Sequence, residues 1–178
     1  MNFNRFIIIV FASIGLLSAC KKDNQFTISG KITHAEGETI YLEELLVSSS
    51  KPIAEVEINN KGEFKFKGKA SIPTFHLLKL SDNNFITLLI DSAENVVVEA
   101  DAVNFSREYH VEGSLGSIQV RELDSKLNAT KHKLDSIGSL NRIYQGNPDY
   151  VSLKPMWENA YDSIVKAQVE YSTDFVIS

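Results

Sequence analysis

Residues 54–67 read Ala54-Glu55-Val56-Glu57-Ile58-Asn59-Asn60-Lys61-Gly62-Glu63-Phe64-Lys65-Phe66-Lys67: two segments of alternating apolar and charged side chains, joined by a turn. Alternation with period two is typical of a strand with one buried face. A three-residue loop ending in Gly62, with this glycine in the left-handed region, would join two strands as a hairpin. The predicted cross-strand pairs are Asn59–Glu63, Ile58–Phe64, Glu57–Lys65, Val56–Phe66 and Glu55–Lys67. The lysines are then interpreted as a solvated strand face rather than a binding patch.

The same alternation continues in both directions, from Phe26 to Val111. Turn residues rich in Gly, Asn, Asp and Ser separate the alternating runs. We predict about eight strands, near residues 26–32, 39–46, 52–59, 63–70, 74–81, 85–91, 95–101 and 109–112. Because the connections are short, they favour an antiparallel meander closed as a β sandwich or an open barrel. The predicted fold class is α+β, with this antiparallel unit followed by an antiparallel helical hairpin.

After Gly113 the apolar spacing changes to alternate steps of three and four residues, which predicts a helix. Ser114 or Ser117 is the expected N-cap. A second helix is predicted from about Ser152, with Pro155 tolerated only in its first turn. The predicted seams consist of Val120, Leu123, Leu127, Thr130, Leu134, Ile137, Asn141 and Tyr144 in one helix, and Trp157, Tyr161, Ile164, Gln168, Tyr171 and Phe175 in the other. Thr130, Asn141 and Gln168 either fix the register or are poorly buried.

The N-terminus has the order of a secretory signal: a basic start at Arg5, an apolar run over residues 6–17, then small residues. The apolar run is shorter than the roughly 18 residues expected of a membrane-spanning helix. Leu17-Ser18-Ala19-Cys20 resembles the bacterial lipobox, so Cys20 is predicted to be acylated and to anchor the chain to a membrane. An ordinary signal that happens to contain a cysteine is the alternative. Cys20 is the only cysteine in the sequence, so a Cys-x-x-Cys motif is absent.

The predicted organisation has four parts: a signal peptide (1–19), a lipid-anchored linker (20–25), an all-β domain (26–113) and a helical hairpin spacer (114–178). Removing residues 1–19 takes away one charged residue, Arg5, and changes the formal net charge from −5 to −6. This mild acidity disfavours nucleic acid or an anionic lipid surface as partner. The spacer stops on the apolar residues Phe175, Val176 and Ile177, so we expect the natural protein to continue past Ser178.

Candidate chemical sites are few. The four histidines, His34, His76, His110 and His132, lack the spacing of metal ligands, and His76 is expected at the rim of a strand. Residues 113–117, Gly-Ser-Leu-Gly-Ser, lack the lysine of a phosphate-binding loop, so a cap-and-hinge role is preferred. No catalytic, metal or cofactor residue is predicted. Three Asp-Ser-aliphatic tripeptides resemble O-glycosylation acceptors of some bacterial envelope proteins; their serines are Ser92, Ser136 and Ser163. Helix and turn composition is the alternative reading of these tripeptides.

The arrangement resembles a known kind of bacterial envelope lipoprotein. The residues that carry the resemblance are the lipobox, Phe26-Thr27-Ile28-Ser29-Gly30-Lys31-Ile32, residues 53–68, and Val111-Glu112-Gly113-Ser114 leading into the helices. They look like the domain of unknown function that precedes a thioredoxin-like domain of the alkyl hydroperoxide reductase/thiol-specific antioxidant type. The resemblance implies a thioredoxin-like domain C-terminal to the helices, which is absent from this chain.

The function expected from the resemblance is that of a non-catalytic accessory domain. It would position a thiol-disulfide oxidoreductase or recruit its protein client, anchored through lipid on Cys20. The outer membrane is preferred over the inner one because Lys21-Lys22 replaces the aspartate of an inner-membrane retention signal. The body would then face the periplasm or the cell exterior. The alternative is a standalone envelope lipoprotein that binds a glycan, peptide or protein in a cleft of the β domain.

Overall fold

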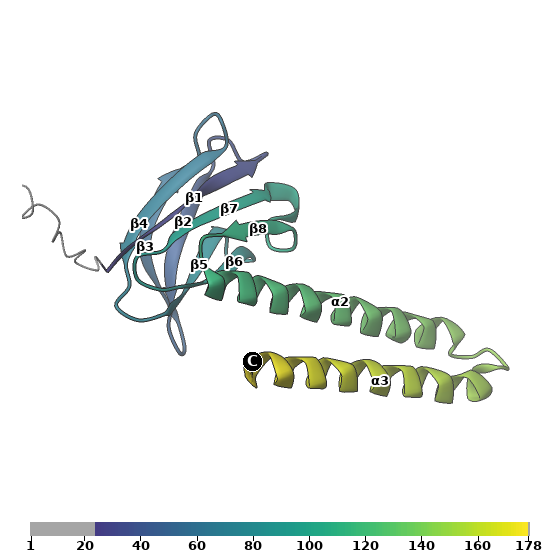
Figure 1. Cartoon of the computed structure of the whole chain (residues 1–178). Coiled ribbons are helices and arrows are strands. Elements are labelled where there is room, and N and C mark those ends of the chain that lie inside the picture. Colours follow the sequence, from purple (N-terminus) through teal and green to yellow (C-terminus); the bar gives the residue numbers. More distant parts are fainter. Residues whose placement is uncertain (1–23, 178) are drawn as a thin grey trace, which may run out of the picture.

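The computed structural model describes residues 24–177, which form two packed β-sheets followed by two long antiparallel helices (Figure 1). The strands are β1 (Gln25–Thr33), β2 (Thr39–Leu45), β3 (Ser50–Glu57), β4 (Glu63–Lys69), β5 (Thr74–Ser81), β6 (Asn84–Ile90), β7 (Asn95–Asp101) and β8 (Tyr109–Glu112). One sheet has the strand order β4-β1-β7-β8 and the other β3-β2-β5-β6. A short 3-10 helix, η1 (Ala102–Asn104), precedes β8. The predicted α+β class and its eight strands are confirmed, and the β unit is a sandwich rather than a barrel.

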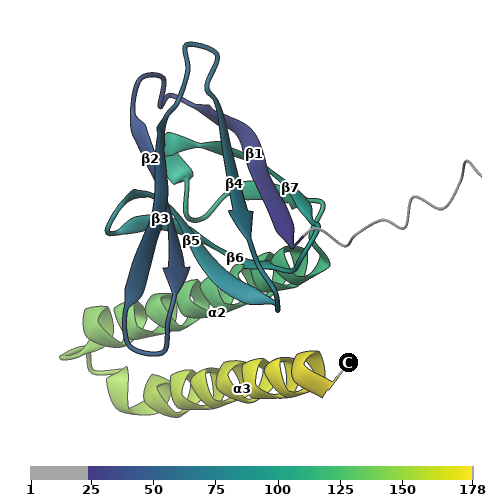
Figure 2. The ribbon, with the colours of Figure 1, turned by 90° about the vertical axis from the view of Figure 1, so that its left-hand side faces the viewer.

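The turn at residues 59–63 has the predicted geometry. Gly62 has φ +80°, and the N–H of Asn59 donates to the carbonyl of Glu63 at 3.0 Å. The predicted β3–β4 ladder beyond this turn is wrong, because the two strands separate into different sheets (Figure 2). β3 pairs with β2, so Val56 lies opposite Ile40, and β4 pairs with β1, so Phe66 lies opposite Ile28. Alternation determines which face of a strand is buried, but not which neighbour supplies its hydrogen bonds.

The predicted meander is also wrong at the centre of the first sheet. β1 lies between β4 and β7 and is parallel to β7, with Gly30 opposite Val98. A Cβ atom at Gly30 would lie 1.7 Å from the carbonyl oxygen of Val98, so only glycine fits at this position. The chain must cross between the sheets after β1 to make this parallel pair. Such a crossing leaves no trace in the local alternation.

The core lies between the two sheets, where the inward side chains of every strand except β3 are almost fully buried. His76 belongs to this core rather than to the rim, which corrects the prediction from sequence. It is 2% exposed, its Nδ1 donates to the carbonyl of Thr74 at 3.0 Å, and its ring meets Phe26 edge-on at 5.0 Å. Burial lowers the pKa of His76, so the neutral imidazole is favoured.

The helices are α2 (Leu115–Tyr144) and α3 (Tyr150–Ile177). Ser114 is the N-cap of α2, as predicted. α3 begins before the predicted Ser152, so Pro155 lies inside the helix rather than in its first turn. The hydrogen bond that proline cannot donate would have reached the carbonyl of Val151. Val151 is 81% exposed, so water can satisfy that carbonyl instead.

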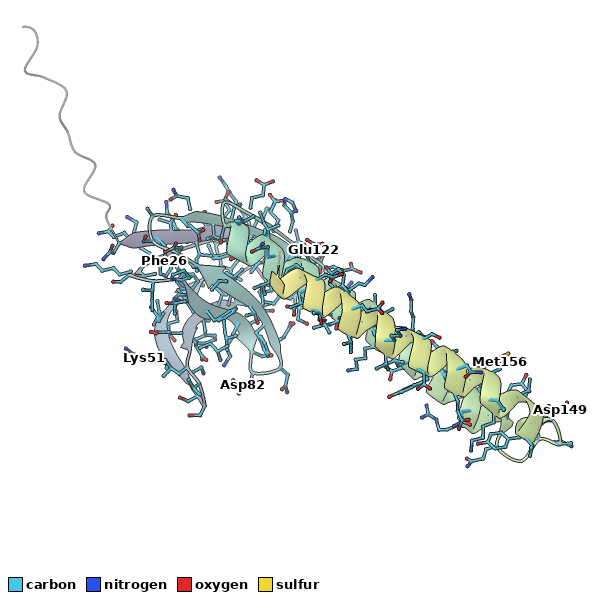
Figure 3. All side chains as sticks on the ribbon, turned by 60° about the horizontal axis from the view of Figure 1, so that its bottom comes forward. Phe26, Lys51, Asp82, Glu122, Asp149 and Met156 are labelled. Carbon is cyan, nitrogen blue, oxygen red and sulfur yellow. The ribbon has the colours of Figure 1, made fainter. Side chains whose placement is uncertain are left out.

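α2 contacts the sandwich along β6 and β8, and α3 packs on α2, so the hairpin projects away from the sheets (Figure 3). Two predicted seam residues meet across it: the Thr130 hydroxyl donates to Oε1 of Gln168 at 2.6 Å. Near the loop, Trp157 stacks at an angle on Tyr144, 5.5 Å between ring centroids. The polar pair therefore fixes the register, while Asn141 is exposed.

Candidate functional site

The junction between the sandwich and α2 is built from two serines and one carbonyl. The hydroxyls of Ser114 and Ser117 donate to the carbonyl oxygen of Leu89 at 2.8 and 2.9 Å. The Ser114 hydroxyl also accepts the backbone N–H of Ser117 at 3.2 Å, as expected of an N-cap. Leu89 belongs to β6, the edge strand of its sheet, where outward carbonyls lack a strand partner. The first turn of α2 thus covers this sheet edge and is fixed to it.

Two glycines let the chain approach the sheets closely at this junction. Gly113 has φ +81°, and a Cβ atom there would lie 1.9 Å from the carbonyl oxygen of Asn95. At Gly116 a Cβ would come within 3.0–3.1 Å of the Leu89 side chain and carbonyl. Residues 113–117 therefore form a fixed junction, and the predicted cap is confirmed while a freely moving hinge does not fit these contacts.

A second contact ties α2 to β8, one turn further along the helix. The Nε of Arg121 donates to the carbonyl of Tyr109, and its guanidinium lies 5.7 Å from the centroid of that tyrosine ring. The Tyr109 hydroxyl is buried without a hydrogen-bond partner among the described residues. Burial, and then the nearby Asp124 carboxylate, raise the pKa of Tyr109 to about 12. Nothing in the spacing of the sequence signals this contact.

An open hollow of about 600 Å³ lies between α2 and α3 of the helical hairpin. Leu134, Gly138 and Asn141 line it from α2, and Trp157 and Tyr161 line it from α3. Gly138 has no side chain to fill the space, since a Cβ there would meet only the end of Arg142, at 3.9 Å. The wall combines aromatic, aliphatic and amide groups with the charged side chains of Lys154, Glu158 and Asp162.

His34 lies beside the carboxylate of Asp101, on the sandwich. His34 and the hydroxyl of Thr33 both bind Oδ2 of Asp101, at 2.7 and 2.8 Å, so hydroxyl and imidazole share one carboxylate oxygen rather than forming a relay. The Val103 N–H, then Thr33, then His34 lower the pKa of Asp101. Across residues 24–177, no group of three metal-ligating side chains is close enough to hold an ion.

The predicted modification sites lie far apart in the chain. Cys20 and the whole predicted signal fall outside the described residues. Ser136 and Ser163 are on exposed helix faces, where each hydroxyl donates to the carbonyl four residues earlier. Ser92 is in a half-buried turn, and its N–H is held by the Asp91 carboxylate. Glycosylation of these serines stays a prediction.

Comparison with protein families gives one match, the model described as "Domain of unknown function (DUF4369)", over residues 26–117. This range covers just over half of the 178 residues. The chain belongs to the DUF4369 family. The DUF4369 match begins in β1 and ends at Ser117, so it contains the sandwich together with both serines of the junction. No curated protein matches this DUF4369 chain.

The rest of the hairpin lies outside the DUF4369 match. Within the described part of the chain, none of the helices combines the length and apolar character needed to cross a membrane. The family region is therefore a β sandwich that ends in an ordered helix start, and α2 carries the chain outward from there.

Proposed function

We propose that this DUF4369 chain is a lipid-anchored, non-catalytic accessory unit of a thioredoxin-like thiol-disulfide oxidoreductase in the bacterial envelope. In this proposal acylated Cys20 holds the sandwich at a membrane, with the outer membrane preferred. The hairpin positions the oxidoreductase or recruits its protein client. The sequence supports the anchor through Leu17-Ser18-Ala19-Cys20, which directly follows an apolar run.

The cysteine content supports a non-catalytic role for this chain, with the dithiol chemistry carried by a partner. Cys20 is the only thiol in the sequence, so a dithiol reaction would need cysteines supplied by another domain or protein. The resemblance to envelope lipoproteins with a thioredoxin-like domain names the class of that partner. The DUF4369 match is consistent with the resemblance, because it covers the domain that would precede the oxidoreductase.

The hairpin supplies the single structural observation that favours a partner-holding role. Several of its apolar side chains face solvent: Ile143 is 74% exposed, Val169 59% and Met156 57%. Ile143 lies on α2, and Met156 and Val169 lie on α3, so a partner that covers the hairpin would remove apolar surface of both helices from water. The fixed junction at Ser114 and Ser117 would hold such a partner at a defined place relative to the sandwich.

The alternative, a standalone lipoprotein that binds its ligand on the β domain, has one supporting observation. The β2–β3 register shifts between Leu42 and Glu43, and a hollow of about 460 Å³ opens there. Tyr41 and Ile53 line this hollow and are each more than a third exposed. An aromatic and an aliphatic side chain beside backbone polar groups could hold a glycan or a peptide.

The anchor is tested by membrane fractionation of cells that express Cys20→Ala. We expect the variant to become soluble or to remain unprocessed, whereas Ser13→Ala, a small change inside the apolar run, should stay membrane-bound. Unchanged membrane attachment of Cys20→Ala would refute the lipobox assignment.

The partner is tested by photo-crosslinking in cells. A photoreactive residue at Val169 on α3 should yield adducts with a thioredoxin-like domain, identified by mass spectrometry. The same residue at Val47, in the β2–β3 loop and fully exposed, is the matched control. Adducts with a glycan, peptide or protein at Val47 but not at Val169 would favour the alternative function.

A further inference from the structure

One edge strand of the sandwich, β4, carries a row of three lysines, two of which, Lys65 and Lys67, were predicted to face glutamates on β3. Lys65, Lys67 and Lys69 alternate with the buried Phe64 and Phe66 along β4, so all three point outward, and all are exposed. Alternate residues of a strand are about 7 Å apart, so the row spans about 13 Å. We call these three residues the β4 lysine row.

The row forms no ion pair, and the one carboxylate on its face of β4, Glu63, lies two residues before Lys65 and accepts the side-chain amide of Asn59 at 3.1 Å. Glu55 and Glu57, the partners predicted for Lys67 and Lys65, lie on β3 in the other sheet. The residues opposite the row on β1 are Gln25, Thr27 and Ser29, which carry no charge. None of the ion pairs formed within residues 24–177 involves the row.

Apart from Glu63, the carboxylates on the outer face of this sheet lie on strands that do not neighbour β4. The strand order β4-β1-β7-β8 places Glu99 and Asp101 two strands from β4, and Glu112 three strands away. Neighbouring strands are about 4.8 Å apart, so these carboxylates lie roughly 10–14 Å from the row. The Debye length at physiological ionic strength is about 8 Å, so the row is largely screened from them. A net negative chain can therefore present a local positive edge.

The row also lies where the chain enters the sandwich. Gln25, the first residue of β1, pairs with Lys69. Cys20 precedes Gln25 by five residues, and these residues can span at most about 18 Å. Two further lysines, Lys21 and Lys22, lie within this linker. A surface that holds residue 20 is thus within reach of the row.

We propose that the β4 lysine row binds the anionic phospholipid headgroup layer of the membrane and orients the sandwich on it. This inference rests on the lipid anchor of the proposed function. Membrane attachment through one lipid group is commonly reinforced by a basic patch. Phe26, beside this edge, and Asp149, at the tip of the hairpin, lie at opposite ends of the molecule (Figure 3). With the row on the membrane, the hairpin points away from it and presents its tip to the surroundings.

The alternative is that these lysines protect an edge strand from pairing with other chains, as charged residues on edges commonly do.

Vesicle binding distinguishes membrane binding from protection of the edge strand. The probe is the mature chain from residue 20 with Cys20→Ser, which carries no lipid, on vesicles of equal parts phosphatidylglycerol and phosphatidylcholine. The comparison vesicle is phosphatidylcholine alone. Because no acyl group is present, the outcome does not depend on the Cys20→Ala fractionation, which tests the anchor separately.

Each lysine near an anionic surface contributes about a five-fold gain in affinity. We expect Lys65→Gln/Lys67→Gln/Lys69→Gln to lower the affinity for the anionic vesicles on the order of 100-fold. The matched control, Lys131→Gln/Lys133→Gln/Lys166→Gln, removes the same charge from exposed positions on the helices and should change the affinity less than about two-fold. Both variants should unfold at the wild-type urea concentration, because all six side chains are exposed.

Three results would overturn the proposal. In the first, the unsubstituted chain binds both vesicle types equally. In the second, the two triple variants weaken binding to the same extent, which would show that the affinity for the anionic vesicles depends on the total charge of the chain and not on the row. In the third, soluble polyphosphate binds as tightly as the anionic vesicles and depends equally on the row, which would assign these lysines to a soluble polyanion.

Discussion

The β sandwich and the helical hairpin bury their apolar side chains to very different extents. In the sandwich, Ile28, Leu42, Leu88 and others are 0% exposed. In the described part of the two helices, Trp157 is the one apolar side chain that is buried, at 7% exposure, and Leu127 on the predicted seam is 43% exposed. Both regions nevertheless have the secondary structure that their sequence periods predict.

The difference shows that regular secondary structure and tertiary stability are separate properties. Helices of 30 and 28 residues are about 45 and 42 Å long, yet they pack on each other along a single seam. Most helical stability in proteins comes from tertiary packing. We therefore infer that the sandwich provides most of the free energy of folding, and that the hairpin is held chiefly at its junction with β6 and β8.

The largest expected effect compares one substitution in both regions. Leu88→Ala removes a fully buried side chain from the sandwich and should lower the free energy of unfolding by about 3–5 kcal/mol. Leu127→Ala removes the same atoms from the hairpin and should cost less than about 1 kcal/mol, because its site is already open to solvent. Urea unfolding followed by circular dichroism measures both. Equal losses would show that the hairpin is packed as well as the sandwich.

The junction itself is tested with a pair of glycines. Gly113→Ala adds left-handed strain and a clash with the Asn95 carbonyl, and should cost about 2–4 kcal/mol. Gly37 has φ +82° but open space around it, so Gly37→Ala should cost only the strain, about 1 kcal/mol. Thermal unfolding of both variants gives the comparison. A Gly113→Ala variant as stable as Gly37→Ala would mean that the junction can shift freely.

The pH dependence of the folding stability compares a buried histidine of the sandwich, His76, with an exposed histidine of the hairpin, His132. Burial lowers the pKa of His76 in the folded state, so below about pH 6.5 the unfolded chain binds a proton that the folded chain does not. Stability should therefore fall as the pH decreases from 7.5 to 5.5, and His76→Leu should remove part of this loss. His132 is exposed on α2, and His132→Asn is the control for replacing a histidine outside the core. The urea midpoint at each pH is the measurement, and an identical pH dependence in wild type and His76→Leu would contradict the buried neutral imidazole.

The smallest expected effect concerns the polar pair of the hairpin. Thr130→Val leaves the Gln168 amide without its donor and should cost about 1 kcal/mol of local stability. Thr130→Val combined with Gln168→Leu replaces both partners and should recover most of that loss. Exchange rates of α3 amides report the local change, while the unfolding midpoint of the sandwich should stay within error. A lower sandwich midpoint in Thr130→Val would show that the two regions unfold together.

The sequence could predict the strands because alternation is a local property. Phe64 and Phe66 are buried and Lys65 and Lys67 exposed, as the pattern at residues 54–67 indicates. The strand partners could not be predicted, because β3 and β4 choose neighbours that lie elsewhere in the chain. The same limit explains His76: a polar residue in a strand suggests the rim, unless the Thr74 carbonyl and Phe26 that surround it are already known.

The candidate site was predictable only in part, for a similar reason. Ser114 is recognisable as an N-cap from its place before an apolar helix. The hydrogen bond that its hydroxyl donates to the Leu89 carbonyl, 25 residues earlier, depends on β6 being an edge strand. The lysine row was visible in the sequence, but its lack of carboxylate partners followed only from the separation of β3 and β4.

Hydrogen exchange of the backbone amides tests most directly whether the sandwich carries the stability and the hairpin depends on its junction. We expect amides of the sandwich strands between Phe26 and Val111 to exchange only through global unfolding. The first turns of α2, next to Ser117 and Arg121, should show intermediate protection. Amides of α3 beyond Tyr161 should exchange fastest. If α3 is protected as strongly as the strands, the hairpin is stable by its own packing, and the proposal that it needs a covering partner loses its physical basis.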